Sequence, residues 1–95
     1  MSVTFRWDPA KARVNLQKHG VSFDEAMSAF TDPLSRTISD PDHSYDEERF
    51  ILLGSSHRNR LLVVVHVDME DTIRIISARE ADRHERRNYE QGPAR

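Results

Sequence analysis

The sequence predicts a single α+β domain, and two observations lead to this prediction. The first third of the chain contains two stretches with helix start and stop signals, whereas the second half contains three β-rich runs separated by short polar turns. Strands gathered in one part of the chain, instead of alternating with helices, are typical of the α+β class. A length of 95 residues suffices for one hydrophobic core but not for two, so we expect residues 1–95 to form one domain.

A short strand and a helix are predicted at the start of the chain. Residues 3–7 alternate apolar and polar side chains, which is the period of a strand with one buried face. Asp8 offers a capping oxygen, Pro9 suits the first helical position, and Gly20 favours a left-handed stop. These signals predict a helix over residues 9–19.

A second, shorter helix is predicted directly after the first. Ser22 and Glu25 have the spacing of a capping box, in which the serine oxygen and the glutamate carboxylate each satisfy a backbone donor. This helix should run to about Phe30, because Pro33 disfavours helical geometry at the residue before it. A weak strand over residues 36–39 and an acidic loop are expected next.

The second half predicts an antiparallel meander followed by a final helix. The β-rich runs span residues 49–56, 60–67 and 72–79. Residues 80–90 are rich in helix formers and end before a Gly-Pro pair. The predicted order is β-α-α-β-β-β-β-α, with a small, mainly antiparallel sheet packed by two N-terminal helices and one C-terminal helix.

Composition excludes several kinds of protein. The chain has no cysteine, so it has no disulfide, thiolate metal site or cysteine nucleophile. It has no apolar signal segment and no aliphatic run near the ~20 residues of a membrane helix, so we expect a soluble, cytoplasmic protein without membrane contact. The net charge of −2 hides basic ends and an acidic middle. The basic parts could bind phosphates and the acidic part a basic partner, although solvated surface also accounts for both.

No metal or cofactor is expected from the acidic stretch or from the histidines. Residues 40–48 alternate oxygen ligands as a calcium loop does, but Tyr45 and Ile51 occupy the positions that require glycine and glutamate. The five histidines include no pair at zinc-motif spacing.

Lys18 and His19 are the first candidate functional residues. They lie in the last turn of the first predicted helix, where the helix dipole favours cations, and this capping role alone accounts for them. A lysine and an imidazole at a rigid helix end could also hold and protonate a phosphate ester. Lys11 and Asn15 are spaced to share the face of Lys18, so that face is basic and polar.

Two further groups surround the predicted sheet. His43, Glu48 and Arg49 lie where the acidic loop enters the sheet, and a loop salt bridge is the alternative to a functional role. Arg74 alternates with isoleucines in the last strand and needs an anion, either a carboxylate such as Glu48 or a substrate phosphate.

The final helix carries arginines together with acids. Because Glu85 and Glu90 share this helix with Arg83, Arg86 and Arg87, ordinary pairing on the helix surface is expected there. The chain contains no serine-histidine-aspartate order, P-loop or dinucleotide fingerprint.

Taken together, these segments resemble the BrnT toxin family of bacterial type II toxin-antitoxin systems. The resemblance extends from Phe5 to Glu90 and rests on WDPAKARVNLQKHGVSFDEA, on HS with EERFILLG, on RLLVVV, and on IRIISAR with ERRNYE, in this order. One position departs from the family pattern, since Asn59 stands where glycine is expected before Arg60. Asparagine tolerates a left-handed turn, so this departure does not weaken the resemblance.

The resemblance implies a RelE-like fold and a ribonuclease that cuts RNA and inhibits translation. It also implies a cognate BrnA-type antitoxin with a ribbon-helix-helix part, which neutralises the toxin and alone contacts operator DNA, and it allows a toxin homodimer within the complex. The positions that match the family motifs are Lys18, His19, His43, Glu48, Arg49, Arg74, Ser77, Arg79, Glu85, Arg86 and Tyr89.

Metal-free cleavage of RNA requires a base for the ribose 2′-hydroxyl, an acid for the leaving 5′-oxygen and cations for the phosphorane. Glu48 and His19 would share the base and acid roles, in either order. Arg79, with Arg74 and Lys18, would stabilise the phosphate. The expected catalytic residues are therefore Lys18, His19, Glu48 and Arg79, and the expected substrate-binding residues are His43, Arg49, Arg74, Ser77, Arg86 and Tyr89.

Two other functions are compatible with the sequence. The helices on either side of Gly20 could form a DNA-binding helix-turn-helix, although the second helix presents Asp24 and Glu25 where phosphate contact needs cations. The chain could instead be a non-catalytic interaction module that docks through its acidic middle.

Overall fold

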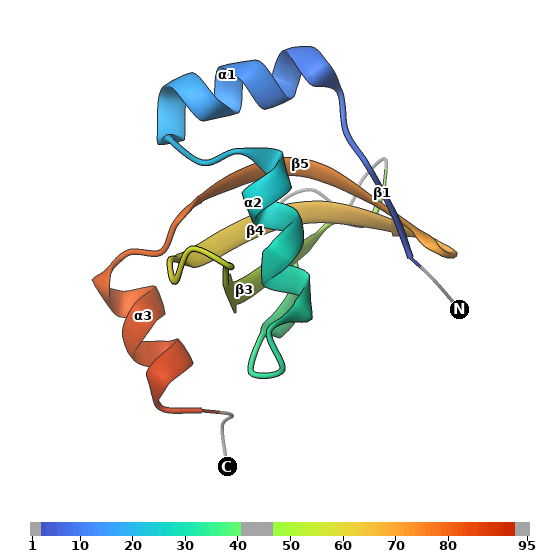
Figure 1. Ribbon diagram of the computed structural model, residues 1–95. Coiled ribbons are helices and arrows are strands. Elements are labelled where there is room, and N and C mark those ends of the chain that lie inside the picture. The colour runs from blue at the N-terminus through green and yellow to red at the C-terminus, as the bar shows by residue number, and fades with distance from the viewer. Residues whose placement is uncertain (1–2, 41–46, 93–95) are drawn as a thin grey trace.

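The computed structural model describes residues 3–40 and 47–92. This part of the chain contains three α-helices, one short 3₁₀-helix and a five-stranded sheet, so the predicted α+β class is confirmed. Figure 1 shows that α1 and α2 lie over one side of the curved sheet, whereas α3 lies beside one end of it. No helix in the described ranges is long and apolar enough to cross a membrane.

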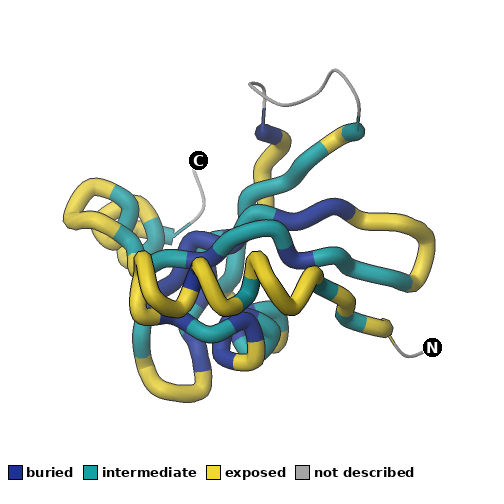
Figure 2. The backbone as a smooth tube through the Cα atoms, turned by 90° about the horizontal axis from the view of Figure 1, so that it is seen from above, coloured by how far each residue is buried: buried dark blue, intermediate teal, exposed yellow. Residues whose placement is uncertain are grey.

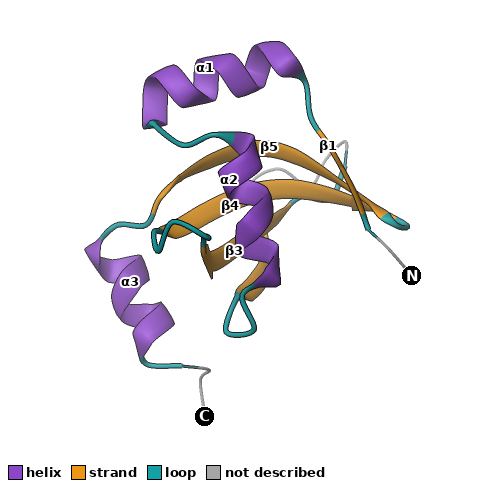
Figure 3. Ribbon diagram, in the orientation of Figure 1, coloured by secondary structure: helices purple, strands orange, loops and turns teal. Residues whose placement is uncertain are grey.

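The elements follow the predicted order. The strands are β1 (Thr4–Arg6), β2 (Arg36–Ser39), β3 (Phe50–Ser55), β4 (Leu61–Met69) and β5 (Thr72–Glu80), and the helices are α1 (Pro9–His19), α2 (Phe23–Ser28), the 3₁₀-helix η1 (Ala29–Thr31) and α3 (Arg83–Glu90). The sheet order is β1-β5-β4-β3-β2. The pairs from β2 to β5 are antiparallel, as predicted, whereas β1 pairs with β5 in parallel (Figure 3).

Local signals set the bounds of α1. The Asp8 carboxylate accepts a hydrogen bond from the Ala10 amide, and Gly20 has a left-handed φ of 69°, as predicted. The strand before it is shorter than predicted. Val3 is 52% exposed, so the expectation of a buried face that includes Val3 is wrong, because a three-residue edge strand leaves its first neighbour in solvent.

The hydrophobic core lies between the sheet and the first two helices. Its sheet side consists of Leu52, Leu62, Val64, Ile75 and Ala78, and its helix side consists of Val21, Phe23, Ala26 and Ala29. Burial of one such large side chain contributes about 1.5–3 kcal/mol. We call this side of the sheet the helix face.

A β-bulge interrupts β5 at Ile76. His66 of β4 pairs with Ile75, but its neighbour Val65 pairs with Ser77. Ile76 is therefore an extra residue without a partner on β4, and the strand changes its alternation at this point.

The bulge sorts the side chains of β5 onto two faces. Ile75 and Ala78 both lie in the core on the helix face, although they are three residues apart. Arg74, Ser77 and Arg79 consequently share the opposite face, because they pair with β4 residues of the other alternation. We call this opposite side the arginine face. Without the bulge, Arg74 and Arg79 would lie on different faces.

The capping box predicted at the start of α2 is only half formed. The Ser22 hydroxyl accepts the Glu25 amide at 3.0 Å, as predicted. The Glu25 carboxylate, however, accepts hydrogen bonds from the Ser56 hydroxyl and the Arg60 guanidinium. A carboxylate that is 2% exposed gains more from a guanidinium than from a backbone amide, which is why this half of the prediction is wrong.

The complete capping box occurs at α3 instead. The Asp82 carboxylate accepts the Glu85 amide, and the Glu85 carboxylate accepts the Asp82 amide. At the β3–β4 turn, Asn59 has φ 60°, so it adopts the left-handed conformation expected at that position. Figure 2 shows that burial is concentrated in the sheet and in α2, whereas most of α1 is exposed.

Candidate functional site

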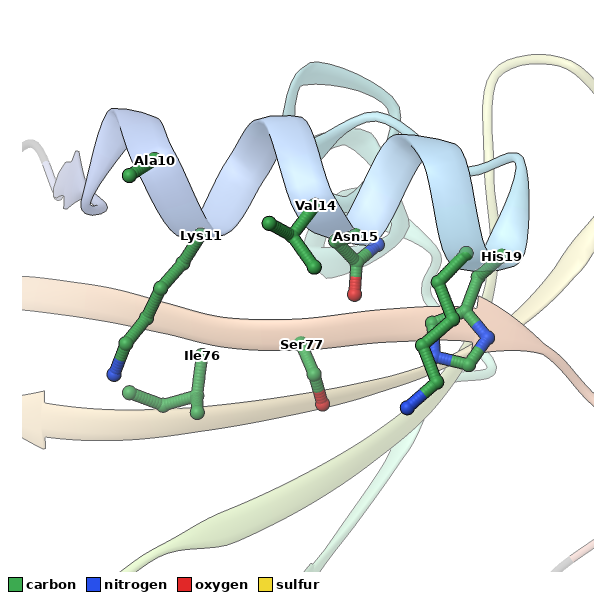
Figure 4. Close-up of a pocket in the computed structure, with 8 residues that line it drawn as sticks. Ala10, Lys11, Val14, Asn15, His19, Ile76 and Ser77 are labelled. Atoms are coloured by element: carbon green, nitrogen blue, oxygen red, sulfur yellow. The ribbon is translucent and has the colours of Figure 1, made fainter.

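An open cleft lies between α1 and the bulged part of β5. It has a volume of about 340 Å³, and its lining includes Lys11, Lys18 and His19 from α1 and Ile76 and Ser77 from β5 (Figure 4). Three of the predicted site residues, Lys18, His19 and Ser77, therefore meet in one place. We call this hollow the α1–β5 cleft.

Asn15 holds the two walls of this cleft together. Its side-chain amide donates to the carbonyls of Ala78 at 2.8 Å and Val21 at 2.9 Å, and its oxygen accepts the Ala78 amide at 3.1 Å. Because β1 pairs only with Thr72, Ile73 and Arg74, the later part of that edge of β5 has no strand neighbour among the described residues. The Asn15 side chain takes the place of that strand.

The polar face predicted for α1 therefore has two different parts. Lys11, Asn15 and Lys18 do line one cleft, as their spacing indicated, but Asn15 is 6% exposed and its hydrogen bonds are internal. The sequence contained a weak indication of this role, because asparagine is a poor helix former and its presence inside a helix suggests a specific hydrogen bond.

The end of α1 that carries Lys18 and His19 is fixed by two contacts. The Gly20 amide donates to the Leu16 carbonyl at 2.8 Å, and Arg60 donates from its guanidinium to the Gly20 carbonyl at 3.0 Å. Arg60 is itself held by Glu25, and this hydrogen bond is the main reason that the pKa of Glu25 is lowered, against the effect of burial. Lys18 and His19 stay exposed.

Arg74 lies on the arginine face with a carboxylate partner. One of its terminal nitrogens donates to both oxygens of Glu47, at 2.6 and 2.7 Å. The suggestion that Glu48 supplies this carboxylate is therefore wrong, since the chain presents the preceding acid to β5. Glu48 is exposed and directly follows the residue that binds Arg74.

Arg79 lies on the same face, nearer to α3. Its two terminal nitrogens bind the two oxygens of Glu85, at 2.9 and 2.8 Å. This fork-to-fork pair lowers the pKa of Glu85, and the Arg79 side chain remains 43% exposed. The predicted pairing of Glu85 with the arginines of its own helix is wrong, because the carboxylate at the helix start points back to β5.

Tyr89 has a partner within the protein. Its hydroxyl donates to the Asp32 carboxylate at 2.5 Å, which raises the pKa of Tyr89 to about 12. Burial disfavours the ionised form of Asp32, but hydrogen bonds from Tyr89 and from the amides of Ser55 and Leu34 outweigh it, and the pKa of Asp32 is lowered. Tyr89 thus ties α3 to the segment that follows η1.

The remaining predicted site residues are not gathered in the cleft. Arg49 is half-buried and Arg86 is exposed, and neither makes a side-chain hydrogen bond or ion pair with another described residue. His43 lies outside the described residues. No ion pair joins Glu48 to Arg49 in the described ranges, and the part of the salt-bridge alternative that involves His43 lies outside them.

The charges near β5 suit a polyanion. Ser77 lies between Arg74 and Arg79 on one face of the strand, and Lys18 and His19 reach the same region from α1. None of the described residues that line the cleft is an acid. Such a surface attracts phosphates even when the net charge of the chain is slightly negative. In the described ranges, no three His, Asp or Glu side chains are placed to hold a metal ion.

The helix-turn-helix alternative does not fit this geometry. The would-be reading helix, α2, has only six residues. Phe23, Glu25 and Ala26 of that helix are buried, and the Glu25 carboxylate is used in the pair with Arg60. A helix packed in this way cannot enter a DNA groove.

A comparison with protein families identifies one family, and a comparison with solved structures identifies a similar fold. Residues 7–85 match the family described as "Ribonuclease toxin, BrnT, of type II toxin-antitoxin system". The fold is similar to that of the Brucella abortus ribonuclease toxin BrnT, whose crystal structure was determined at 1.1 Å, with a TM-score of 0.58 and 22% sequence identity over 86% of this chain and 100% of that chain. A search of curated proteins gave no match.

Proposed function

Because the chain belongs to the BrnT family of ribonuclease toxins of type II toxin-antitoxin systems, we propose that it is a metal-independent endoribonuclease that cuts RNA at the α1–β5 cleft. One observation carries the proposal. Lys18, His19 and Ser77 converge in a cleft without a described acid in its lining, beside the arginine face of β5. This combination offers a proton-transfer group next to cations that can hold a phosphodiester.

The reaction is an attack within the RNA strand. The ribose 2′-oxygen forms a bond to the adjacent phosphorus and loses its proton to a base, while the bond from phosphorus to the 5′-oxygen breaks. That 5′-oxygen takes a proton from an acid. His19, in the cleft lining, fills one of these roles. Glu48, which is exposed outside that lining and directly follows the partner of Arg74, fills the other, and either order balances the protons.

The cations around the cleft stabilise the phosphorane. Lys18 is exposed at the end of α1, and Arg74 and Arg79 flank Ser77 on the arginine face. Each arginine is oriented by one carboxylate, which fixes its guanidinium in place before the substrate arrives. Ser77 donates a hydrogen bond to a phosphate oxygen in this scheme.

The other motif residues belong to the edges of the proposed site. Arg49 and Arg86 have no side-chain partner among the described residues, and they contact phosphates away from the cleavage point. His43 and Tyr89 are assigned to substrate binding by the family motifs alone.

The protein partner in this proposal is a BrnA-type antitoxin with a ribbon-helix-helix part. The antitoxin neutralises the toxin, a toxin homodimer forms within their complex, and only the antitoxin contacts operator DNA. Burial of α2 supports the last point, because it removes the one segment of the toxin that resembled a DNA reader.

The direct test is incubation of purified protein with total RNA, with and without EDTA. We expect cleavage in both samples, and a His19→Ala protein purified in the same way controls for contaminating ribonucleases. No cleavage in either sample would favour the non-catalytic interaction module. Cleavage that EDTA abolishes would contradict the metal-independent mechanism.

A further inference from the structure

Arg6 and Arg74 lie side by side at the edge of the sheet. They are register partners in the parallel pair of β1 and β5, so their backbones are ~5 Å apart. Phe5 packs edge-on against Phe30 in the core, and strand alternation therefore turns Arg6 to the opposite side. Arg74 lies on that same arginine face, since Ile75 next to it is in the core.

The two guanidinium groups are only partly neutralised. Like charges directly opposite each other on neighbouring strands are unfavourable. Glu47 binds one terminal nitrogen of Arg74, but the Arg74 Nε atom is buried and has no partner among the described residues. Arg6 is exposed and makes no side-chain hydrogen bond or ion pair with any described residue. A further anion would stabilise this pair.

There is space for such an anion beside the pair. An open pocket of about 590 Å³ is lined by Arg6 and Arg74 together with Phe5, Trp7 and Asp8. Asp8 is the one acid among the described residues of that lining, and its carboxylate already accepts the amide of Ala10. The pocket is open enough to admit the phosphate and sugar of a nucleotide.

We propose that Arg6 and Arg74 form a second phosphate subsite, which holds a nucleotide that flanks the cleavage site. This inference rests on the proposed function. Arg74 and Ser77 share one face of β5, roughly 10 Å apart at the rise of a strand, so a strand of RNA with its reacting phosphate in the α1–β5 cleft continues over the pair. Arg6 is not among the residues that the family motifs single out.

The test measures binding of RNA oligonucleotides in which every 2′-hydroxyl is methylated, since these cannot be cleaved by attack of the 2′-oxygen. A hexanucleotide spans the cleft and the pair, whereas a dinucleotide fills the cleft alone. Arg6→Ala should weaken hexanucleotide binding roughly three- to tenfold. It should also reduce the slope of log affinity against log salt concentration by about 0.7, the value for one phosphate contact on a single strand.

Arg13→Ala is the matched control. It removes the same charge from an exposed position on α1, where the side chain lines a different pocket, with Leu16 and Asp24. On the dinucleotide, Arg6→Ala and Arg13→Ala should have equal, small effects. Arg6→Lys should keep most of the hexanucleotide affinity. The double variant Arg6→Ala/Arg74→Ala should lose less binding free energy than the two single variants lose together.

The outcomes separate this inference from the proposed function. A wild-type protein that neither binds nor cleaves RNA overturns both. A wild-type protein that binds and cleaves, with Arg6→Ala no weaker than Arg13→Ala on the hexanucleotide, overturns the subsite alone. An equal loss on both oligonucleotides also overturns it, because this would show a long-range charge effect. Thermal unfolding of each variant checks that it is folded.

Discussion

The two sides of the sheet differ in how far their charged and amide groups are buried. On the helix side, Glu25 and Asn15 are buried and make their hydrogen bonds inside the protein, and His66 is buried with its Nε2 atom unpartnered among the described residues. On the arginine face, Arg74 and Arg79 each have a carboxylate partner, yet their side chains are 37% and 43% exposed. One strand, β5, serves both faces. Its inward row stabilises the domain, and its outward row remains accessible to a ligand.

This division depends on one extra residue. The bulge at Ile76 lets Ile75 and Ala78 both enter the core, and it brings Arg74 to the same side as Arg79. Bulges commonly redirect side chains next to functional sites. The comparison therefore predicts that changes on the arginine face alter cleavage with little effect on stability, whereas changes on the helix face do the reverse.

The largest effect is expected from His19→Ala. Removal of an acid–base group should slow RNA cleavage by about 10²- to 10⁴-fold, measured with a fluorescent oligonucleotide. The melting temperature should stay close to that of the wild type, because His19 is exposed. His57→Ala, another exposed histidine, is the control. Equal cleavage by the two variants would remove His19 from the mechanism.

Glu25→Ala tests the helix face. It removes the partner of Arg60 and Ser56 and should lower the free energy of unfolding by about 3 kcal/mol, at the low end for a buried ion pair because Arg60 is partly exposed. The melting temperature should fall by roughly 12–24 °C. In urea unfolding, Glu25→Ala with Arg60→Ala should cost less than the sum of the single changes. A loss below about 1 kcal/mol would contradict the role given to this pair.

The same pair predicts sensitivity to acid. Because the pKa of Glu25 in the folded state lies below its ordinary value of 4.5, its contribution to stability is present above pH 4.5 and is lost as the pH falls through the lowered pKa. Urea unfolding of Glu25→Gln should show a smaller decline below pH 4.5 than the wild type. Parallel declines for the two proteins would show that other carboxyl groups dominate.

Asn15→Ala should lower both the stability of the protein and its rate of RNA cleavage. It leaves the Ala78 amide and the carbonyls of Ala78 and Val21 without partners, and higher helix propensity offsets part of that cost, so the expected loss is about 1–2 kcal/mol. Cleavage should also fall, at a temperature where the variant is folded, because α1 is no longer fixed to β5. Leu16→Ala, at a half-exposed neighbouring position, should change neither the free energy of unfolding nor the cleavage rate. Unchanged cleavage in Asn15→Ala would mean that another contact positions the cleft.

Tyr89→Phe should have the smallest effect. Loss of the hydrogen bond to Asp32 should cost about 1 kcal/mol at neutral pH. Because the pKa of Tyr89 is raised from 10 to about 12, its contribution is full below pH 10 and is lost as the pH rises towards 12. The free energy of unfolding should therefore fall less with rising pH above pH 10 in Tyr89→Phe than in the wild type. An identical pH profile would contradict the contact.

Local sequence signals predicted the elements well. The bounds of α1 and of β2 match the prediction. Those of α1 do so because Asp8, Pro9 and Gly20 act on the adjacent backbone. The parallel pairing of β1 and the bulge at Ile76 could not be predicted, since both depend on distant strands. For the same reason, the sequence could not predict that Glu47, and not Glu48, is the partner of Arg74.

The site was predictable only in part. Physical chemistry placed Lys18 and His19 at a helix end, but only the family resemblance linked them to Ser77, which is 58 residues after His19. Asn15 was placed on the correct face and given the wrong environment. Arg6 had no signal at all, because its proposed role follows from a register that a single sequence does not specify.

Metal-independent attack of the 2′-hydroxyl in the α1–β5 cleft leaves defined RNA ends, which distinguish it from hydrolysis by a metal-bound water. A defined oligoribonucleotide is cleaved in EDTA, and the product termini are identified by mass spectrometry. We expect 2′,3′-cyclic phosphate and 5′-hydroxyl ends, formed about 10²- to 10⁴-fold more slowly by His19→Ala. Products with 3′-hydroxyl and 5′-phosphate ends, formed only when a divalent metal is supplied, would contradict it.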